Sequence, residues 1–174
     1  MARLTPLHEA SHDAIEQLLD DAFGRDRHGR TAYRLRIGAE PDAALSFAAF
    51  EGEALVGTLQ SWPIALVSAD GEGTPLVLVG PVAVAPGRQG TGIGRAMMQA
   101  MLAAADARQE PALTLIGDPD YYGRLFGFTA MATGGWTLPG PWEPHRLLAR
   151  IRPGIALPAV GRLAPARALS PAES

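Results

Sequence analysis

Glycine is concentrated in one short loop whose residue types and spacing suit the binding of an anion. The apolar run Val82-Ala83-Val84 leads into Gly87-Arg88-Gln89-Gly90-Thr91-Gly92-Ile93-Gly94-Arg95, and an amphipathic run follows. This order predicts a strand, a turn and a helix. The first N–H groups of a helix have no intrahelical partner and lie at the positive end of its dipole. Because glycine also lets a ligand approach the backbone closely, the loop predicts a phosphate or pyrophosphate site flanked by arginines.

Two common nucleotide-binding motifs do not fit this loop. A dinucleotide-binding G-x-G-x-x-G motif would need a third glycine where the chain has Arg95 or Met97. A P-loop needs a lysine, and all 15 basic residues of the chain are arginines. The absence of lysine also excludes Schiff-base and other lysine catalysis.

The segment Gln89-Gly90-Thr91-Gly92-Ile93-Gly94 instead resembles the Q-x-x-G-x-G acyl-CoA-binding motif of the GNAT superfamily of N-acetyltransferases. Downstream, Tyr121-Tyr122-Gly123-Arg124-Leu125-Phe126-Gly127-Phe128 resembles the short helix ending in Gly-Phe of that superfamily. The resemblance covers roughly residues 1–155 in element order and is specific in motif over about 78–128. It implies acetyl-CoA as co-substrate and no metal.

The resemblance also implies where the coenzyme would lie. The backbone amides from Gln89 to Arg95 would hold the pyrophosphate, and backbone groups of Val82 and Val84 would pair with the pantetheine arm. In the family, this pairing depends on a splay of the central strand, and Pro81 independently predicts a break in strand pairing there. Asp118 follows the next strand and could cap a helix or contact the ligand. The expected coenzyme-binding residues are Val82, Ala83, Val84, Arg88, Gln89, Gly90, Thr91, Gly92, Ile93, Gly94, Arg95 and Asp118.

Acetyl transfer to an amine needs a group that polarises the carbonyl and a proton donor for the leaving thiolate. The Val82 amide could polarise the carbonyl as an oxyanion-hole donor does. A tyrosine is protonated at neutral pH and can donate to sulfur, so Tyr122 is the first candidate acid and Tyr121 the second. Either ring could instead be a core aromatic. The chain departs from the family here, because Gly123 occupies the usual tyrosine position.

The sequence shows no obvious general base, since no acidic residue lies between Leu78 and Val84. The nearest candidates for the base are Asp118, Glu143 and His145. Each of them could instead be a surface or capping residue, and a chain of water molecules could also accept the proton. The missing base leaves an alternative open: a non-catalytic acyl-CoA-binding or regulatory domain.

A second motif, His8-Glu9-Ala10-Ser11-His12, matches the zinc-binding pattern H-E-x-x-H. On one helix the two histidines would share a face and Glu9 could act as base. No third ligand is evident at a usual distance, and a helix could begin inside the motif. We therefore expect no metal site and a solvated first helical turn.

Composition narrows the remaining possibilities. The chain has 174 residues, a net charge of −3 and no cysteine, so disulfides, thiolate metal sites and a cysteine-linked acyl-enzyme are excluded. No basic tract points to nucleic acid or an anionic membrane as partner. Without a secretory signal or long apolar run, we expect a cytoplasmic protein. The expected acceptor is a small-molecule amine, a peptide N-terminus or a lysine of another protein, and analogy with the superfamily suggests a homodimer.

The elements that would position these residues follow from periodicity and turn signals. Helices are expected from about Ser11, or Thr5, to Phe23, over about Thr31–Ile37, from Ile93 until Pro111 ends the helix, and from Pro119 to about Leu125. Strands are expected over Ala44–Phe50, Ala54–Ile64, Leu76–Val84, Ala112–Ile116, Ala130–Ala132, Trp136–Leu138 and Leu147–Ile151. The Gly/Pro-rich loop around Trp142 either shapes the acceptor pocket or simply packs.

This order predicts an α/β fold: a single-domain, GNAT-type, mixed and mostly antiparallel sheet flanked by helices on both faces. We assign residues 1–163 to the acetyltransferase domain and 164–174 to an Ala/Pro-rich C-terminal tail.

Overall fold

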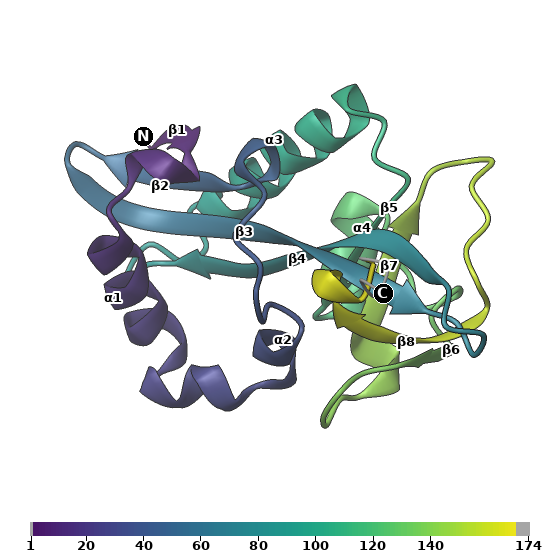
Figure 1. The fold of residues 1–174 in the computed structure, drawn as a ribbon. Coiled ribbons are helices and arrows are strands. Elements are labelled where there is room, and N and C mark those ends of the chain that lie inside the picture. Colours follow the sequence, from purple (N-terminus) through teal and green to yellow (C-terminus); the bar gives the residue numbers. More distant parts are fainter. Residues whose placement is uncertain (1, 170–174) are drawn as a thin grey trace. The chain divides into compact units, whose positions relative to one another are not determined.

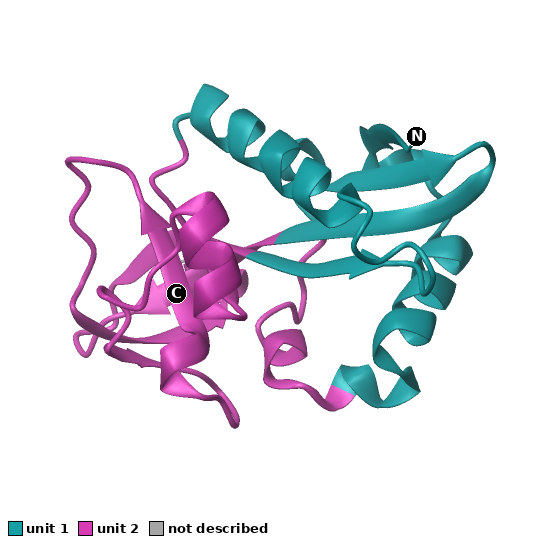
Figure 2. Ribbon diagram, turned by 180° about the vertical axis from the view of Figure 1, so that it is seen from behind, with its two compact units in different colours: residues 1–28, 41–61, 79–109 teal, residues 29–40, 62–78, 110–174 magenta. Residues whose placement is uncertain are grey.

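The computed structural model describes residues 2–169, which form two compact units (Figure 2). Unit 1 contains the chain up to His28, Pro41–Ser61 and Val79–Gln109. Unit 2 contains Gly29–Glu40, Trp62–Leu78 and the chain from Glu110 onward. No helix within residues 2–169 combines the length and apolarity needed to cross a bilayer.

The strands have the order β1-β2-β3-β4-β5-β7, and β8 pairs with both β3 and β6. The β4–β5 and β6–β8 pairings are parallel, whereas β1–β2, β2–β3, β3–β8 and β5–β7 are antiparallel. This confirms the expected mixed, mostly antiparallel sheet. The strands are β1 Arg3–Pro6, β2 Phe47–Glu51, β3 Ala54–Val67, β4 Gly73–Val84, β5 Ala112–Ile116, β6 Gly135–Thr137, β7 Leu147–Ile151 and β8 Val160–Pro165.

In unit 1, helix α1 (His12–Phe23) begins at Ser11, whose hydroxyl accepts a hydrogen bond from the Ala14 N–H at 3.1 Å. This settles the start of the first predicted helix. Its apolar positions Ile15, Leu18 and Leu19 are buried in a cluster that includes Ala48 of β2 and Ala83 of β4. The helical repeat of apolar residues therefore covers one face of these strands (Figure 1).

Helix α3 (Ile93–Ala107) also belongs to unit 1 and buries three methionines, Met97, Met98 and Met101. It contacts β3 closely, because a Cβ added at Gly57 would lie 2.8 Å from Ile93 Cγ2 and 3.0 Å from Met97 Cε. Glycine at position 57 thus leaves room for the Ile93 and Met97 side chains of α3 against the strand.

In unit 2, β7 is antiparallel to β5, and β8 is antiparallel to the end of β3. The core contains Leu66, Leu78 and Trp136, whose indole N–H donates to the Pro158 carbonyl at 2.9 Å. The short helix α2 (Thr31–Arg34) is tied to the Gly/Pro-rich loop through Thr31 to the Pro141 carbonyl and Arg34 to the Pro139 carbonyl. That loop is packed within its unit.

Several predicted elements differ from those observed. No strand forms over Ala130–Ala132, where the described structure has a single bridge between Thr129 and Ala149, because the Thr133 hydroxyl holds a turn through the Ala130 carbonyl. The strand expected from Ala44 begins at Phe47, since residues 43–45 form a 3-10 turn capped by Asp42. Helix α2 ends at Arg34 rather than Ile37.

Strands β1 and β8 were not predicted. Strand β8 runs across the proposed boundary at residue 163, and Ala164 is buried in a small apolar cluster. A 3-10 turn over Ala166–Leu169 follows, and the end of the proposed tail lies outside the described residues.

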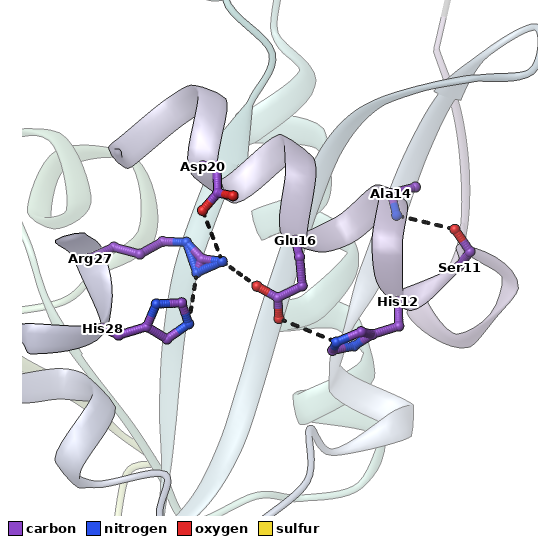
Figure 3. Close-up of polar contacts among 7 residues, drawn as sticks. All are labelled: Ser11, His12, Ala14, Glu16, Asp20, Arg27 and His28. Atoms are coloured by element: carbon purple, nitrogen blue, oxygen red, sulfur yellow. Dashed lines mark hydrogen bonds and ion pairs between the residues drawn. The ribbon is translucent and has the colours of Figure 1, made fainter. Parts of the chain in front are cut away.

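A buried arginine joins α1 to the 3-10 turn Arg25–Gly29 that follows it (Figure 3). Arg27 is 2% exposed. Its guanidinium contacts the carboxylates of Glu16 and, at 3.3 Å, Asp20, and it lies 3.3 Å from the His28 ring nitrogen. Because Glu16 and Asp20 are one helical turn apart, both reach the same guanidinium. The cluster fixes how the chain leaves α1.

We expect the carboxylates to matter more for stability than the arginine. The double variant Glu16→Gln/Asp20→Asn would remove the charge of two carboxylates that contact this buried cation, at a cost of about 3 kcal/mol in unfolding free energy. Arg27→Met keeps the apolar stem and leaves carboxylates that can reach water, so its cost is about 1 kcal/mol. Urea unfolding of both variants measures the difference, and a larger loss for Arg27→Met would contradict this account.

Candidate functional site

The glycine loop leaves β4 and enters α3 with its backbone exposed to solvent. Every residue from Pro86 to Gly92 is exposed. Gly87, Gly90 and Gly92 have φ values of +91°, +79° and +88°, and no atom lies within 4 Å of a Cβ added at any of the three. These left-handed conformations favour glycine, and the open space beside them lets a ligand reach the backbone.

The start of α3 lacks the usual side-chain cap. Gly92 is the N-cap residue and makes no side-chain cap hydrogen bond, although its carbonyl accepts from the Ala96 N–H at 2.9 Å. No acidic residue lies in the first turn. The amides at the positive end of the helix dipole are therefore not satisfied by a side chain at the cap, as expected of an anion-binding turn.

The structure brings the loop and the end of β4 together. A Cβ added at Gly94 would lie 3.5 Å from Val84 Cγ2 and 3.9 Å from Val82 Cγ1, so the first turn of α3 packs on these two residues. Val82 and Val84 are half-buried, and Ala83 points into the cluster beneath α1. The predicted pyrophosphate and pantetheine positions are thus contiguous in unit 1.

The two arginines of the loop differ in their surroundings. Arg88 Nε donates to the Glu51 carboxylate at the end of β2, a contact that sequence reasoning did not anticipate. Arg95 lies exposed in the first turn of α3. Thr91 turns its hydroxyl inward to the Arg88 carbonyl.

The pairing of β4 with β5 is short. Within residues 2–169 the parallel register comprises Val77 with Leu113 and Leu78 with Thr114. It ends before the Gly80-Pro81 peptide, which is cis. This agrees with the break in pairing that Pro81 predicts.

The two tyrosines lie on α4 (Pro119–Phe126) in unit 2. Asp118 caps this helix by accepting from the Asp120 N–H at 3.0 Å, which is one of the two roles that the sequence left open for it. At the other end, Gly127 is left-handed and its N–H donates to the Gly123 carbonyl at 3.1 Å. The helix runs without interruption past Gly123, so the displaced tyrosine needs no break in the helix.

Tyr122 is the more enclosed of the pair. Its ring lies against Gly117, where an added Cβ would come within 2.5 Å of Tyr122 Cε2. The ring stands edge-on to that of Tyr121, with 5.0 Å between the two ring centroids. Tyr121 is 41% exposed. Burial raises the pKa of the Tyr122 hydroxyl above 10.0, Tyr121 and Asp118 raise it further, and Arg146 opposes them. Tyr122 thus keeps its proton at neutral pH and can donate it.

The raised pKa makes stability depend on pH in alkaline solution. The unfolded chain loses the Tyr122 proton near pH 10, before the folded chain does, so rising pH above about 10 favours unfolding. We expect the unfolding free energy of the wild type to fall more steeply between pH 9 and 11 than that of Tyr122→Phe. Urea unfolding at these pH values tests this, and equal slopes would contradict it.

The three candidate bases are exposed. Glu143 and His145 contact each other, with His145 Nε2 3.5 Å from Glu143 Oε2, and both side chains lie mostly in solvent. The Asp118 carboxylate is exposed and committed to its cap. None of the three has the burial that would mark a tuned base.

The zinc-like motif is divided between two elements. His8 lies in the 3-10 turn Leu7–Glu9, Ser11 is the N-cap, and His12 opens α1. The two histidines therefore do not share a helical face, and His12 contacts Glu16 at 3.8 Å instead. No group of three or more potential metal ligands forms within residues 2–169.

A family model for the acetyltransferase (GNAT) domain matches residues 3–131, about three quarters of the chain. The chain belongs to this family. The match includes β4, the glycine loop, α3 and the tyrosine helix of this GNAT domain. No curated protein matches the chain.

Solved structures agree with the family. The GNAT family N-acetyltransferase YhbS from Escherichia coli, in complex with CoA, has a TM-score of 0.70 at 21% identity, over 97% of this GNAT chain and 90% of that one. A GNAT family acetyltransferase from Brucella melitensis, in complex with acetyl-CoA, has a TM-score of 0.65 at 25% identity, over 98% and 99%. A probable N-acyltransferase from Enterococcus faecalis has a TM-score of 0.56 at 21% identity, over 75% and 33%.

Proposed function

We propose that this GNAT domain transfers the acetyl group of acetyl-CoA to a primary amine by direct attack in a ternary complex. The observation that carries the proposal is the exposed loop before α3, with Gly87, Gly90 and Gly92 left-handed and open to a ligand. The structures from Escherichia coli and Brucella melitensis were solved with CoA and acetyl-CoA, which supports the same coenzyme here.

The coenzyme is held by backbone more than by side chains. Amides from Gln89 to Arg95 bind the pyrophosphate, with Arg95 and Arg88 adding positive charge. Backbone groups of the Val82–Val84 segment pair with the pantetheine arm, as a strand edge pairs with an extended ligand. The short β4–β5 register supports this, since it ends at Leu78 and β4 continues to Val84.

The chemistry needs one bond formed and one broken. The amine nitrogen attacks the acetyl carbon, the carbonyl is polarised by the Val82 N–H, and the C–S bond then breaks. Tyr122 donates its proton to the leaving sulfur, which its raised pKa allows at neutral pH. The nitrogen releases its own proton to water, because the candidate carboxylates are exposed. The amine acceptor and a cytoplasmic location belong to the same proposal.

One observation favours a second candidate, a non-catalytic acyl-CoA-binding domain. Residues Leu76 to Val84 carry no carboxylate, and the remaining candidate bases are solvent-exposed. Such a domain would bind acetyl-CoA without releasing thiol when an amine is added.

Two measurements on the wild type separate these functions. Calorimetric titration with acetyl-CoA and with desulfo-CoA measures binding at the glycine loop, for which we expect micromolar affinity. Thiol release is then followed with a panel of primary amines. Binding with amine-dependent release supports the enzyme, binding without release supports the binding domain, and no binding of either ligand overturns both.

A further inference from the structure

Strand β3 carries two buried side-chain oxygens whose hydrogen-bonding capacity the fold leaves unused. Within residues 2–169, Thr58 Oγ1 and Gln60 Oε1 are buried and make no hydrogen bond. Thr58 is 0% exposed and Gln60 7%. Nearby polar groups are satisfied, because the Ser61 hydroxyl donates to the Leu45 carbonyl at 2.7 Å and Ser46 Oγ accepts from the Ser61 N–H at 3.0 Å. Unpaired buried oxygens destabilise a fold, so two on one strand require a reason.

Both oxygens belong to the same face of the strand. Side chains two residues apart in a strand point the same way, so Thr58 and Gln60 lie side by side. Thr58 is directly opposite Ala48 of β2, which belongs to the apolar cluster beneath α1. Gly57, on the other face, lies against Ile93 of α3. The two oxygens are therefore on the α1 face.

On the same face, the strand next to β3 is β4, which holds the acetyl group in the proposed function. The Ala85 N–H donates to the Val56 carbonyl at 2.8 Å, which aligns the two strands. Ala83 of β4 belongs to the same cluster as Ala48, the residue opposite Thr58. Counted along both strands from that hydrogen bond, Gln60 is level with Pro81 of β4, and the two strand backbones are about 5 Å apart.

We propose that this pair of oxygens binds the amine nitrogen of the acetyl acceptor, an inference that rests on the proposed function. Gln60 Oε1 accepts a hydrogen bond from the attacking N–H, and Thr58 Oγ1 behind it accepts or relays a second one. A primary amine supplies the donors that both oxygens lack. The nitrogen is then held next to the carbonyl that the Val82 N–H polarises, which selects acceptors with at least two N–H groups.

The test uses substitutions that remove each oxygen with little change of shape, Gln60→Met and Thr58→Val. We expect the acceptor KM to rise about tenfold in Gln60→Met, the value of one lost hydrogen bond, with acetyl-CoA affinity within twofold of the wild type. The unfolding temperature should stay the same or rise in both variants, because an unpaired buried oxygen is gone. Gln60→Asn, which keeps a shorter amide, should recover part of the acceptor affinity.

Ser61→Ala is the matched control, since it removes a buried hydroxyl of the same strand that already has a partner. It should lower the unfolding temperature and leave the acceptor KM unchanged. If Gln60→Met lowers the unfolding temperature in the same way, or keeps the wild-type acceptor KM, the oxygens are structural and the proposal is overturned. If the wild type releases no thiol with any amine, the proposed function itself has failed, which is a distinguishable result.

Discussion

Replacing Gly92 by Trp should lower the affinity for acetyl-CoA by at least about 100-fold, the equivalent of roughly 2.7 kcal/mol of binding free energy. Gly92 is the N-cap of α3, has φ +88° and faces open space on the ligand side of the loop. An indole there would cover the amides that the pyrophosphate needs. Calorimetric titration with acetyl-CoA measures the loss.

The control for this prediction must carry the same backbone strain. Gly154, between β7 and β8, has φ +86° and likewise nothing within 4 Å of an added Cβ. Gly154→Trp should therefore lower the unfolding temperature about as much as Gly92→Trp and leave acetyl-CoA binding intact. Wild-type affinity in Gly92→Trp would show that these amides do not hold the pyrophosphate.

Removing the Tyr122 hydroxyl should slow turnover by about 100-fold, the lower end of what a positioned acid contributes. Tyr122→Phe keeps the ring that packs against Gly117 and deletes only the proton donor. Because the hydroxyl acts as the thiolate leaves, we expect kcat to fall while acetyl-CoA affinity changes less than threefold. Steady-state thiol release and calorimetry give the two numbers.

Tyr121→Phe is the natural comparison, because the neighbouring ring is more exposed and stands edge-on to Tyr122. We expect kcat within about threefold of the wild type in that variant. A large loss in Tyr121→Phe with none in Tyr122→Phe would transfer the acid role to Tyr121. Wild-type kcat in both variants would favour direct protonation of the leaving sulfur by water.

Local signals predicted the central elements well. Strands β5 and β7 have the bounds expected from their apolar runs, and Ile93 opens α3 because Gly92 stops the turn before it. The glycine loop could be predicted for the same reason, because its conformation depends on residues that are neighbours in sequence. Each of these features needs no partner from a distant part of the chain.

Elements that depend on distant partners were missed. Strand β1 is four residues long and ends in Pro6, and it is a strand because β2 pairs with it. The last two residues of β8 fall in the segment assigned as an Ala/Pro-rich tail, yet Ala164 pairs with Ala65 of β3. Neither segment has the length or alternation that would identify a strand by itself.

The buried polar groups were also missed, although weak signals existed. Glu16 and Asp20 are four residues apart on α1, a spacing that suits a shared cationic partner such as Arg27. Thr58, Gln60 and Ser61 are polar residues inside a strand whose other side chains are mostly apolar. Only the three-dimensional contacts distinguish a satisfied pair of this kind from an unsatisfied one.

The contact between Arg88 and Glu51 has a consequence for ionic strength. A loop with an uncompensated arginine would lose phosphate affinity steeply as salt screens the attraction. Here Arg88 already has a counter-charge, so phosphate binding exchanges one ion pair for another and salt weakens both. The two effects partly cancel, which leaves Arg95 and the helix dipole to set a shallow salt dependence. The loop would then retain its coenzyme over a wider range of salt than its two arginines alone suggest.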